Sequence, residues 1–173
     1  MFQNHPRMLL RTASCIWLLA TAAFGAALAE PAPVPVAVLE FDYVDTSGET
    51  REQSAFHSER LAQLATALRT DLEHSGRFRI VQMTCEPAPC SITQSDPAQL
   101  VEAARRAGAR LLLFGGVHKM STLVQWAKAQ VLDVQTEQLV FDRLLTFRGD
   151  DVDAWQHAEA FILKDITAQT LIR

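Results

Sequence analysis

Two kinds of hydrophobic pattern alternate along this chain. The runs 34–41 (Val-Pro-Val-Ala-Val-Leu-Glu-Phe) and 111–117 (Leu-Leu-Leu-Phe-Gly-Gly-Val) are apolar at nearly every consecutive position. A strand that is covered on both faces has this pattern, so both runs are predicted to be buried strands, with 111–117 at the centre of a sheet. The shorter run 78–81 (Phe-Arg-Ile-Val) predicts a third strand.

Helical spacing follows each of the first two strands. The first helix is predicted to begin at Ser54 and to end at Gly76, with leucines at positions 61, 64, 68 and 72 on its buried face. The second is predicted to begin at Asp96-Pro97, because aspartate is a favoured N-cap and proline fits the first helical position. Each strand is therefore expected to lead into a helix that crosses back over the sheet.

The last part of the chain predicts a hairpin and a final helix. The segments 123–134 and 139–147 are long and joined by four polar residues, which is typical of an antiparallel hairpin. The final helix is expected to be capped by Asp150 or Asp151 and to bury one face. That face carries Trp155, Ala158, Ile162 and Ile166.

The predicted order is therefore β-α-β-α-β-β-β-α. Crossovers between strands of one sheet are almost always right-handed, which makes the first three strands parallel, and the hairpin then extends the sheet in the antiparallel sense. The predicted fold class is a single-domain α/β sandwich with a mixed sheet and helices packed on it.

The first 29 residues have the pattern of a cleaved signal peptide. Arg7 and Arg11 precede an apolar run from Cys15 to Leu28, and Ala27-Leu28-Ala29 resembles a signal peptidase site. The run is shorter than the roughly 20 residues that a spanning helix needs. We therefore expect a signal peptide at 1–29, a single domain at 30–173, a periplasmic location and no stable membrane span in the mature chain.

Composition argues against two classes of partner. The chain has 16 Lys and Arg against 20 Asp and Glu, a net charge of −4, and loss of Arg7 and Arg11 with the signal would make it −6. No basic block stands out along the chain, so neither a nucleic acid nor an anionic lipid surface is an expected partner.

Two cysteines remain beyond the signal, Cys85 and Cys90. An even number in an exported chain predicts a disulfide, here closing a short loop that two prolines stiffen. A metal site and a reactive thiol pair are the alternatives, and no cofactor or metal is expected.

Polar residues far apart in sequence are predicted to meet at one edge of the sheet. If the first and third strands are parallel, their carboxyl ends share an edge, which the hairpin and the last helix also reach, and open α/β sheets bind ligands at such edges. The candidate contacts for a ligand or partner are Asp45, Ser47, Lys119, Ser121, Arg148 and Asp150. Trp126, on a hairpin strand, is a candidate exposed aromatic contact.

Plainer roles exist for several of these residues. Asp150 is a possible helix cap, and Lys119 and Arg148 are able to neutralise Asp42 and Asp45. Ser47 lies in a segment with ordinary turn chemistry.

Catalytic motifs are weak. The chain has no Gly-x-Ser-x-Gly turn, no His-Glu-x-x-His helix, no phosphate loop and no dinucleotide fingerprint. One alternative is a hydrolase or cation-dependent enzyme that uses the carboxylates of Asp42 and Asp45 with His118. Another is a structural domain whose partner adds a strand to an exposed sheet edge. The histidines, including His57, are expected to be solvated.

Three segments resemble an uncharacterised family of exported bacterial proteins. They are 38–41 (Val-Leu-Glu-Phe) followed by 45–47 (Asp-Thr-Ser), 116–121 (Gly-Val-His-Lys-Met-Ser), and 148–151 (Arg-Gly-Asp-Asp) with Trp155. The chain departs from the family pattern at Thr122, Ala154 and Glu137. The order of elements is more distantly similar to the N-terminal domain of the Tol-Pal translocation protein and to related envelope assembly and synthase-activator proteins.

Those relatives act by binding other proteins, and the resemblance implies the same for this chain. The resulting hypothesis is a periplasmic, non-enzymatic binding or accessory protein that contacts an envelope protein or a small ligand at the sheet edge.

Overall fold

The computed structural model describes residues 31–86 and 88–169. Their elements are β1 (Val34–Val38), β2 (Asp42–Asp45), α1 (Ser54–His74), β3 (Phe78–Ile80), α2 (Pro97–Arg106), β4 (Leu111–Lys119), β5 (Val124–Asp133), β6 (Gln138–Arg148) and α3 (Val152–Ala168). The expected signal peptide, residues 1–29, lies outside the described residues.

The strands form one mixed sheet, as predicted. Their order is β3-β1-β4-β5-β6, and the short β2 pairs with β4 beyond the end of β1. β1 is parallel to both β3 and β4, whereas β4, β5 and β6 are antiparallel neighbours. The α/β class and the parallel arrangement of the first three predicted strands are confirmed.

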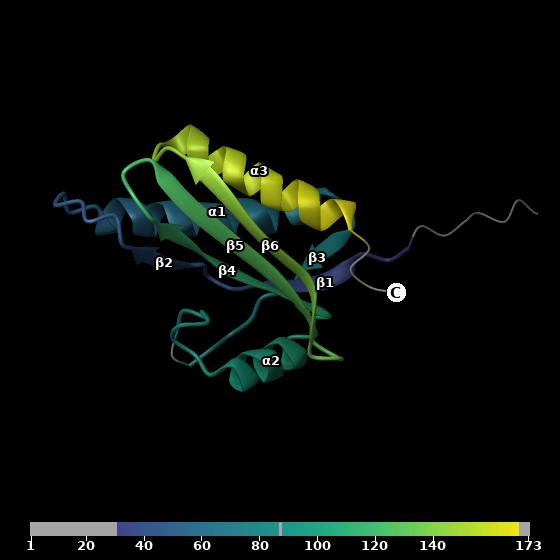
Figure 1. Cartoon of the computed structure of the whole chain (residues 1–173). Helices are drawn as coiled ribbons and strands as arrows, with labels where there is room; N and C mark the ends of the chain where they lie inside the picture. Colours follow the sequence, from purple (N-terminus) through teal and green to yellow (C-terminus); the bar gives the residue numbers. More distant parts are fainter. Residues whose placement is uncertain (1–30, 87, 170–173) are drawn as a thin grey trace, which may run out of the picture. The chain divides into compact units, whose positions relative to one another are not determined.

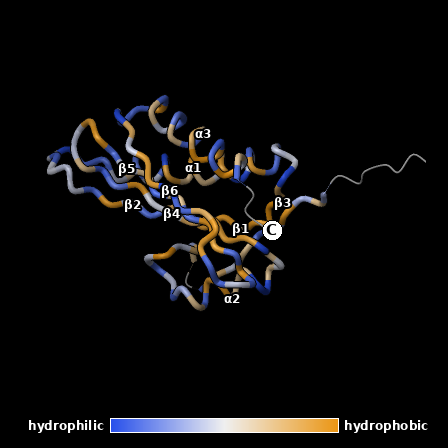
Figure 2. The backbone as a smooth tube through the Cα atoms, turned by 45° about the vertical axis from the view of Figure 1, so that its right-hand side comes forward, coloured by the Kyte–Doolittle hydropathy of each residue, from blue (hydrophilic) through white to orange (hydrophobic). Residues whose placement is uncertain are grey.

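Helices cover the two faces of the sheet unequally (Figure 1). α1 and α3 lie on one face, where the main core joins Leu68 of α1 and Ile162 of α3 to Leu113 of β4. α2 lies on the other face and packs Leu100 against Leu112 at the beginning of β4. Figure 2 shows hydrophobic residues gathered along β1 and beside α2. None of the three described helices lies over this second face at the end of β4 and the adjoining parts of β5 and β6.

The helix caps and the disulfide agree with the sequence. The Asp96 carboxylate accepts from the backbone N–H groups of Ala98 and Gln99, and that of Asp151 accepts from Ala154. Asp151 is thus the cap of α3, and Asp150 is free for a different role. Cys85 and Cys90 form the predicted disulfide, and both pack against the core beneath α2.

The first strand is interrupted, which the sequence did not predict. The run 34–41 was expected to be one strand, but β1 ends at Val38 and pairing with β4 resumes at Asp42. Asp42 comes four residues after Val38, whereas their partners on β4, Gly116 and Leu113, are three residues apart. The segment from β1 to β2 therefore carries one extra residue. Such a bulge bends the strand and re-aims its side chains.

The bulge places Phe41 over a glycine of β4. A Cβ atom added to Gly115 would lie 2.8 Å from the ring atom Cε1 of Phe41 and would collide with the carbonyl oxygen of Lys128 on β5. Phe41 is buried in the main core. Position 115 therefore requires glycine, because Phe41 and the backbone of Lys128 both approach it too closely for a Cβ atom.

We predict that Gly115→Ala destabilises the fold by about 2 to 3 kcal/mol, because a backbone oxygen cannot move aside as a side-chain tip can. Gly116→Ala is the matched control, since its Cβ would lie 3.0 Å from the nearest atom, the carbonyl oxygen of Asp42. Urea unfolding measures both variants. An equal loss of stability in the two would contradict this account of Gly115.

An acidic side chain is buried between α1 and α3. Glu159 of α3 lies among α1 residues that include Leu64 and Ala67. Burial, and to a lesser degree the negative charge of Asp71, raises the pKa of Glu159 from 4.5 to about 6. The fold thus favours the protonated carboxyl.

We predict that Glu159→Gln stabilises the protein at pH 7 by about 1 to 2 kcal/mol. The folded pKa lies above the unfolded value, so the native protein loses stability as the pH rises from 4.5 to about 6 and does not regain it above. The advantage of the variant should therefore disappear below pH 4.5. Urea unfolding across this range tests it, with Glu73→Gln at an exposed position of α1 as the control.

Candidate functional site

Four strands end or begin at the same end of the sheet, along the edge formed by the strand termini, as the sequence predicted. Asp45 of β2 lies opposite Lys119 of β4, Lys119 opposite Gln125 of β5, and Gln125 opposite Phe147 of β6. We call this edge the rim (Figure 1). Each of the six candidate residues belongs to one of these strand ends or to the adjoining loops, and the rim is defined by them: Asp45, Ser47, Lys119, Ser121, Arg148 and Asp150.

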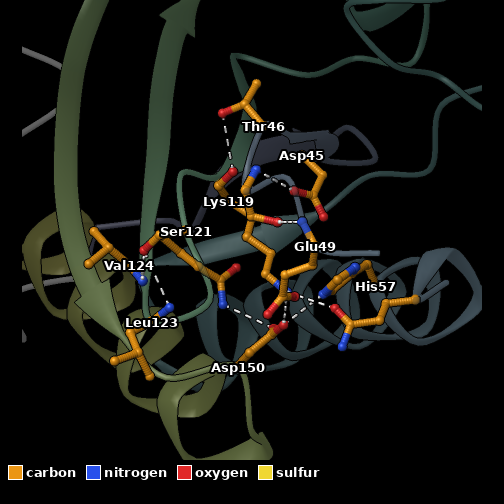
Figure 3. A network of polar contacts seen from close by, with 12 residues as sticks. Asp45, Thr46, Glu49, His57, Lys119, Ser121, Leu123, Val124 and Asp150 are labelled. Atoms are coloured by element: carbon orange, nitrogen blue, oxygen red, sulfur yellow. Dashed lines mark hydrogen bonds and ion pairs between the residues drawn. The ribbon is translucent and has the colours of Figure 1, made fainter. Parts of the chain in front are cut away.

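Lys119 is the centre of the rim, but it is not on the surface. Only 1% of the residue is exposed. Its Nζ atom donates to Glu49 Oε2 at 2.6 Å, to Gln53 Oε1 at 2.7 Å and to Asp150 Oδ2 at 2.7 Å (Figure 3). These three acceptors satisfy all three ammonium protons. In place of a solvent-facing contact, Lys119 ties the loop after β2 to the start of α3.

Asp150 is the other half of this arrangement. Its Oδ2 atom also accepts from Nε2 of His57 at 2.9 Å, while Oδ1 accepts from Nε2 of Gln125 at 3.0 Å and Nε1 of Trp155 at 3.3 Å. The ring of Tyr43 stacks on His57 with centroids 4.5 Å apart. One carboxylate therefore joins β4, β5, α1 and α3.

The pKa values of the pair follow from these contacts. Burial lowers the pKa of Lys119, but the hydrogen bonds and charges of Asp150 and Glu49 outweigh burial and leave it raised. Burial raises the pKa of Asp150, and the hydrogen bonds from Lys119, His57 and Trp155 outweigh burial and leave it lowered. Both groups are therefore held in their charged forms.

The remaining rim residues shape loops or face solvent. The Ser121 hydroxyl accepts from the backbone N–H groups of Leu123 and Val124 and so closes the β4–β5 turn. Ser47 donates its backbone N–H to the Asp45 carboxylate at 2.8 Å. Hydrogen bonding from the side chain of Ser47, and next from this backbone N–H, lowers the pKa of Asp45. Arg148 is exposed at the end of β6.

A shallow hollow of about 280 Å³ opens beside the rim, on the sheet face that α2 leaves bare. Its apolar walls come from three strands: Val44 of β2 is 51% exposed, Trp126 of β5 is 38% exposed and Leu144 of β6 is 55% exposed. His118 of β4 lies edge-on to the Trp126 ring at 5.9 Å, and its Nε2 atom is 2.8 Å from Oγ1 of Thr46. The expectation that Trp126 is exposed is confirmed.

The proposed pair of catalytic carboxylates does not form. Asp42 lines the hollow and its carboxylate accepts from the Thr93 hydroxyl, whereas Asp45 lies three residues further along β2. Residues three apart on a strand point to opposite faces, so the two carboxylates cannot act on one atom. Within 31–86 and 88–169, no group of three His, Cys, Asp or Glu side chains is placed to hold a metal ion.

Several residues of the network were not predicted. Glu49, Gln53 and Gln125 were not candidates, and the expectation that His57 is solvated is wrong, because it is buried. One signal was present for Lys119: Leu111, Leu113 and Val117 point into the main core, and a period of two places Lys119 on the same face. The loop partners Glu49 and Gln53 carry no such periodic signal.

No helix in the described part of the chain combines the length and the apolar character needed to cross a membrane.

We predict that Lys119→Met destabilises the fold by about 3 to 5 kcal/mol, because it leaves the carboxylates of Glu49 and Asp150 together without their cation. Lys128→Met is the control: Lys128 pairs with Asp142 at 3.1 Å on the exposed face, and such a pair contributes about 1 kcal/mol or less. Chemical unfolding at pH 7 compares them. Similar losses for both variants would show that the Lys119 contacts are no stronger than a surface pair.

Comparison with solved structures finds chains of related architecture. TolB from Acinetobacter baumannii is 20% identical with a TM-score of 0.49, and the match covers 80% of this chain and 28% of the TolB chain. The PelC dodecamer from Paraburkholderia phytofirmans is 19% identical with a TM-score of 0.47, covering 79% and 89% of the two chains. The LpoB C-terminal domain from Salmonella enterica is 16% identical with a TM-score of 0.45, covering 69% and 86%.

This chain thus corresponds to less than a third of the TolB chain that it matches. Comparison with curated proteins gives no significant match. The family model described as "Protein of unknown function (DUF2380)" matches residues 34–167, from the first residue of β1 almost to the end of α3. The resemblance to an uncharacterised family is confirmed, and the chain belongs to this family, DUF3280.

Proposed function

We propose that this protein is an exported, non-enzymatic accessory domain that binds another envelope protein beside the rim. The binding surface is the open sheet face over β2, β4, β5 and β6, which we call the docking face. It is formed by the hollow residues Val44, His118, Trp126 and Leu144, with Arg148 at its corner.

The observation that carries this proposal is the exposure of three large apolar side chains on one sheet face. Val44, Trp126 and Leu144 come from three strands and line a single hollow. Contiguous apolar surface of this kind marks interaction sites, and tryptophan with a neighbouring arginine is typical of the residues that dominate protein interfaces.

The chemistry of the surface favours a protein over a small ligand. The hollow is shallow and wide, whereas small-molecule sites enclose most of their ligand. Arg148 forms no ion pair with another described residue, so a carboxylate of the partner is able to meet it. We expect the partner to present an apolar side chain to Trp126 and an acidic group to Arg148.

The polar rim supports the docking face from behind. Lys119 and Asp150 hold the strand ends together, and Ser121 fixes the turn that leads into the Trp126 strand. Asp45, at the end of β2, and Ser47, in the loop that follows, lie at the rim and offer secondary polar contacts there. A surface that is rigid before binding loses less conformational entropy when a partner docks.

Export is supported by two independent features. The Cys85–Cys90 disulfide fits an oxidising compartment such as the periplasm. Residues 1–29 have the charge and hydropathy pattern of a signal peptide, which would leave 30–173 as the mature domain.

Site-specific photo-crosslinking in intact cells tests the function. A photoreactive residue at position 126 should yield one discrete adduct, and the same residue at Leu139 should yield none. Leu139 is a matched control because it is exposed to a similar degree on β6 but lies outside the hollow. With the partner identified, Trp126→Ser should weaken binding about ten-fold or more, and Leu139→Ser should not. Equal adducts from both positions, or unchanged binding by Trp126→Ser, would refute the docking face.

A further inference from the structure

The outer edge of β6 carries unpaired backbone groups. β6 is the last strand of the sheet, with β5 on one side only. Gly149 N–H donates to the Leu123 carbonyl at 3.0 Å, so these two residues form a hydrogen-bonded pair of the β5–β6 ladder. Such pairs alternate along an antiparallel ladder, so odd-numbered residues of β6 bond to β5. The N–H and C=O groups of the even-numbered residues therefore point outward: Asp142, Leu144, Thr146 and Arg148.

This edge is complementary to itself. If two copies of β6 pair antiparallel through these outward groups, a two-fold axis at Leu145 sets Asp142 opposite Arg148 of the second copy. The symmetry repeats that opposite-charge pair on the other side of the axis, and Leu144 lies opposite Thr146 of the second copy. Moving the axis to Arg143 or to Leu144 leaves both charges without an opposite partner.

An exposed phenylalanine on α3 lies on the same flank. Phe161 is 47% exposed, and it precedes by one helical turn Asp165, whose carboxylate pairs with Arg143 of β6 at 2.6 Å. Residues four apart share a helix face, so Phe161 faces the β6 side of α3. The opposite side of α3, with Gln156 and Glu159, faces α1. No described element of this chain lies beyond β6 to cover Phe161.

Phe161 is also level with the axis. α3 runs back along β6, and its residue Asp165 contacts Arg143. From Asp165 to Phe161 the helix rises about 6 Å, and from Arg143 to Leu145 the strand rises about 6.6 Å in the same direction. The register was derived from the charges of Asp142 and Arg148 alone. The same register also brings the two Phe161 side chains together across the axis, which supports it independently.

We propose that the protein forms a symmetric dimer in which a second copy adds to the β6 edge, with the axis at Leu145. Asp142, which pairs with Lys128 of its own chain at 3.1 Å, then also lies opposite Arg148 of the second copy. The two Phe161 rings meet above the joined strands, and the two sheets become one. The dimer shares Arg148 and Leu144 with the docking face, but it is argued from other observations, the outward backbone groups of β6 and the exposed Phe161.

Charge exchange tests the register. Asp142→Arg and Arg148→Asp each set like charges opposite one another, and each should raise the dissociation constant in sedimentation equilibrium about ten-fold or more. The double variant Asp142→Arg/Arg148→Asp restores opposite charges and should return the constant to within about three-fold of the parent. Phe161→Ser should also weaken the dimer, and Trp126→Ser, which alters only the docking face, should not. Unfolding midpoints confirm that each variant is folded.

Cysteine pairing tests the axis independently. Leu145→Cys lies opposite its own copy at a Cα separation of about 4.5 Å, within the range that a disulfide spans, and should give a dimer that reducing agent dissolves. Gln138→Cys is the control, since the same register separates its two copies by about 46 Å. A parent protein that stays monomeric at submillimolar concentration overturns the proposal. Failure of the double variant to recover, or equal crosslinking at both positions, overturns it as well.

Discussion

A single ammonium group determines how the rim of this protein is built. Lys119 ends the central strand β4 on the core side, and its burial without counter-charges would be prohibitive. Glu49 comes from the loop after β2 and Asp150 from the residues before α3, so two distant segments are held to the end of β4. The same Asp150 also anchors His57 of α1. The rim exists because one buried cation requires acceptors that the local strand cannot supply.

This arrangement separates support from recognition. Because Lys119 and Asp150 are saturated by each other and by neighbouring groups, this buried pair is a scaffold, whereas Arg148 at the same rim stays exposed. In the proposed function, recognition belongs to the opposite face of the same strands. Along β4 and β5 the alternation of side chains puts Lys119 and Gln125 inward and their neighbours His118 and Trp126 outward. Because Lys119 and Gln125 are fixed in the interior, the alternation also fixes the positions of His118 and Trp126 on the exposed face.

The sequence was informative wherever a local rule applied. Continuous apolar runs identified the central strands, and the Asp96-Pro97 pair identified the start of α2. The even number of cysteines in a chain expected to be exported identified the disulfide. Strand direction then predicted the rim itself. Local rules did not find β2, because the single extra residue between β1 and β2 is defined only by its register with β4.

The partners of the buried charge were beyond prediction for a related reason. Nothing in a polar loop marks Glu49 and Gln53 as acceptors for a lysine 70 and 66 residues away. His57 lies on the first turn of α1, and its burial is explained by contacts outside the helix, with the Asp150 carboxylate and the Tyr43 ring. Even a prediction that Lys119 points inward would have shown only that its ammonium group needs acceptors. It would not have shown which residues supply them.

The two edges of the sheet differ in a way that limits how copies can join. β3, at one edge, has three residues, Phe78–Ile80, whereas β6, at the other, has eleven. A long exposed edge is normally a hazard because it accepts further strands without end. Pairing of β6 with itself uses the long edge of both copies. Among the described strands, it leaves only short edges at the ends of the joined sheet, those of β3 and of the four-residue β2. Three or four residues offer too few hydrogen bonds to continue the series, so an association through β6 closes at two copies and does not grow into a fibre.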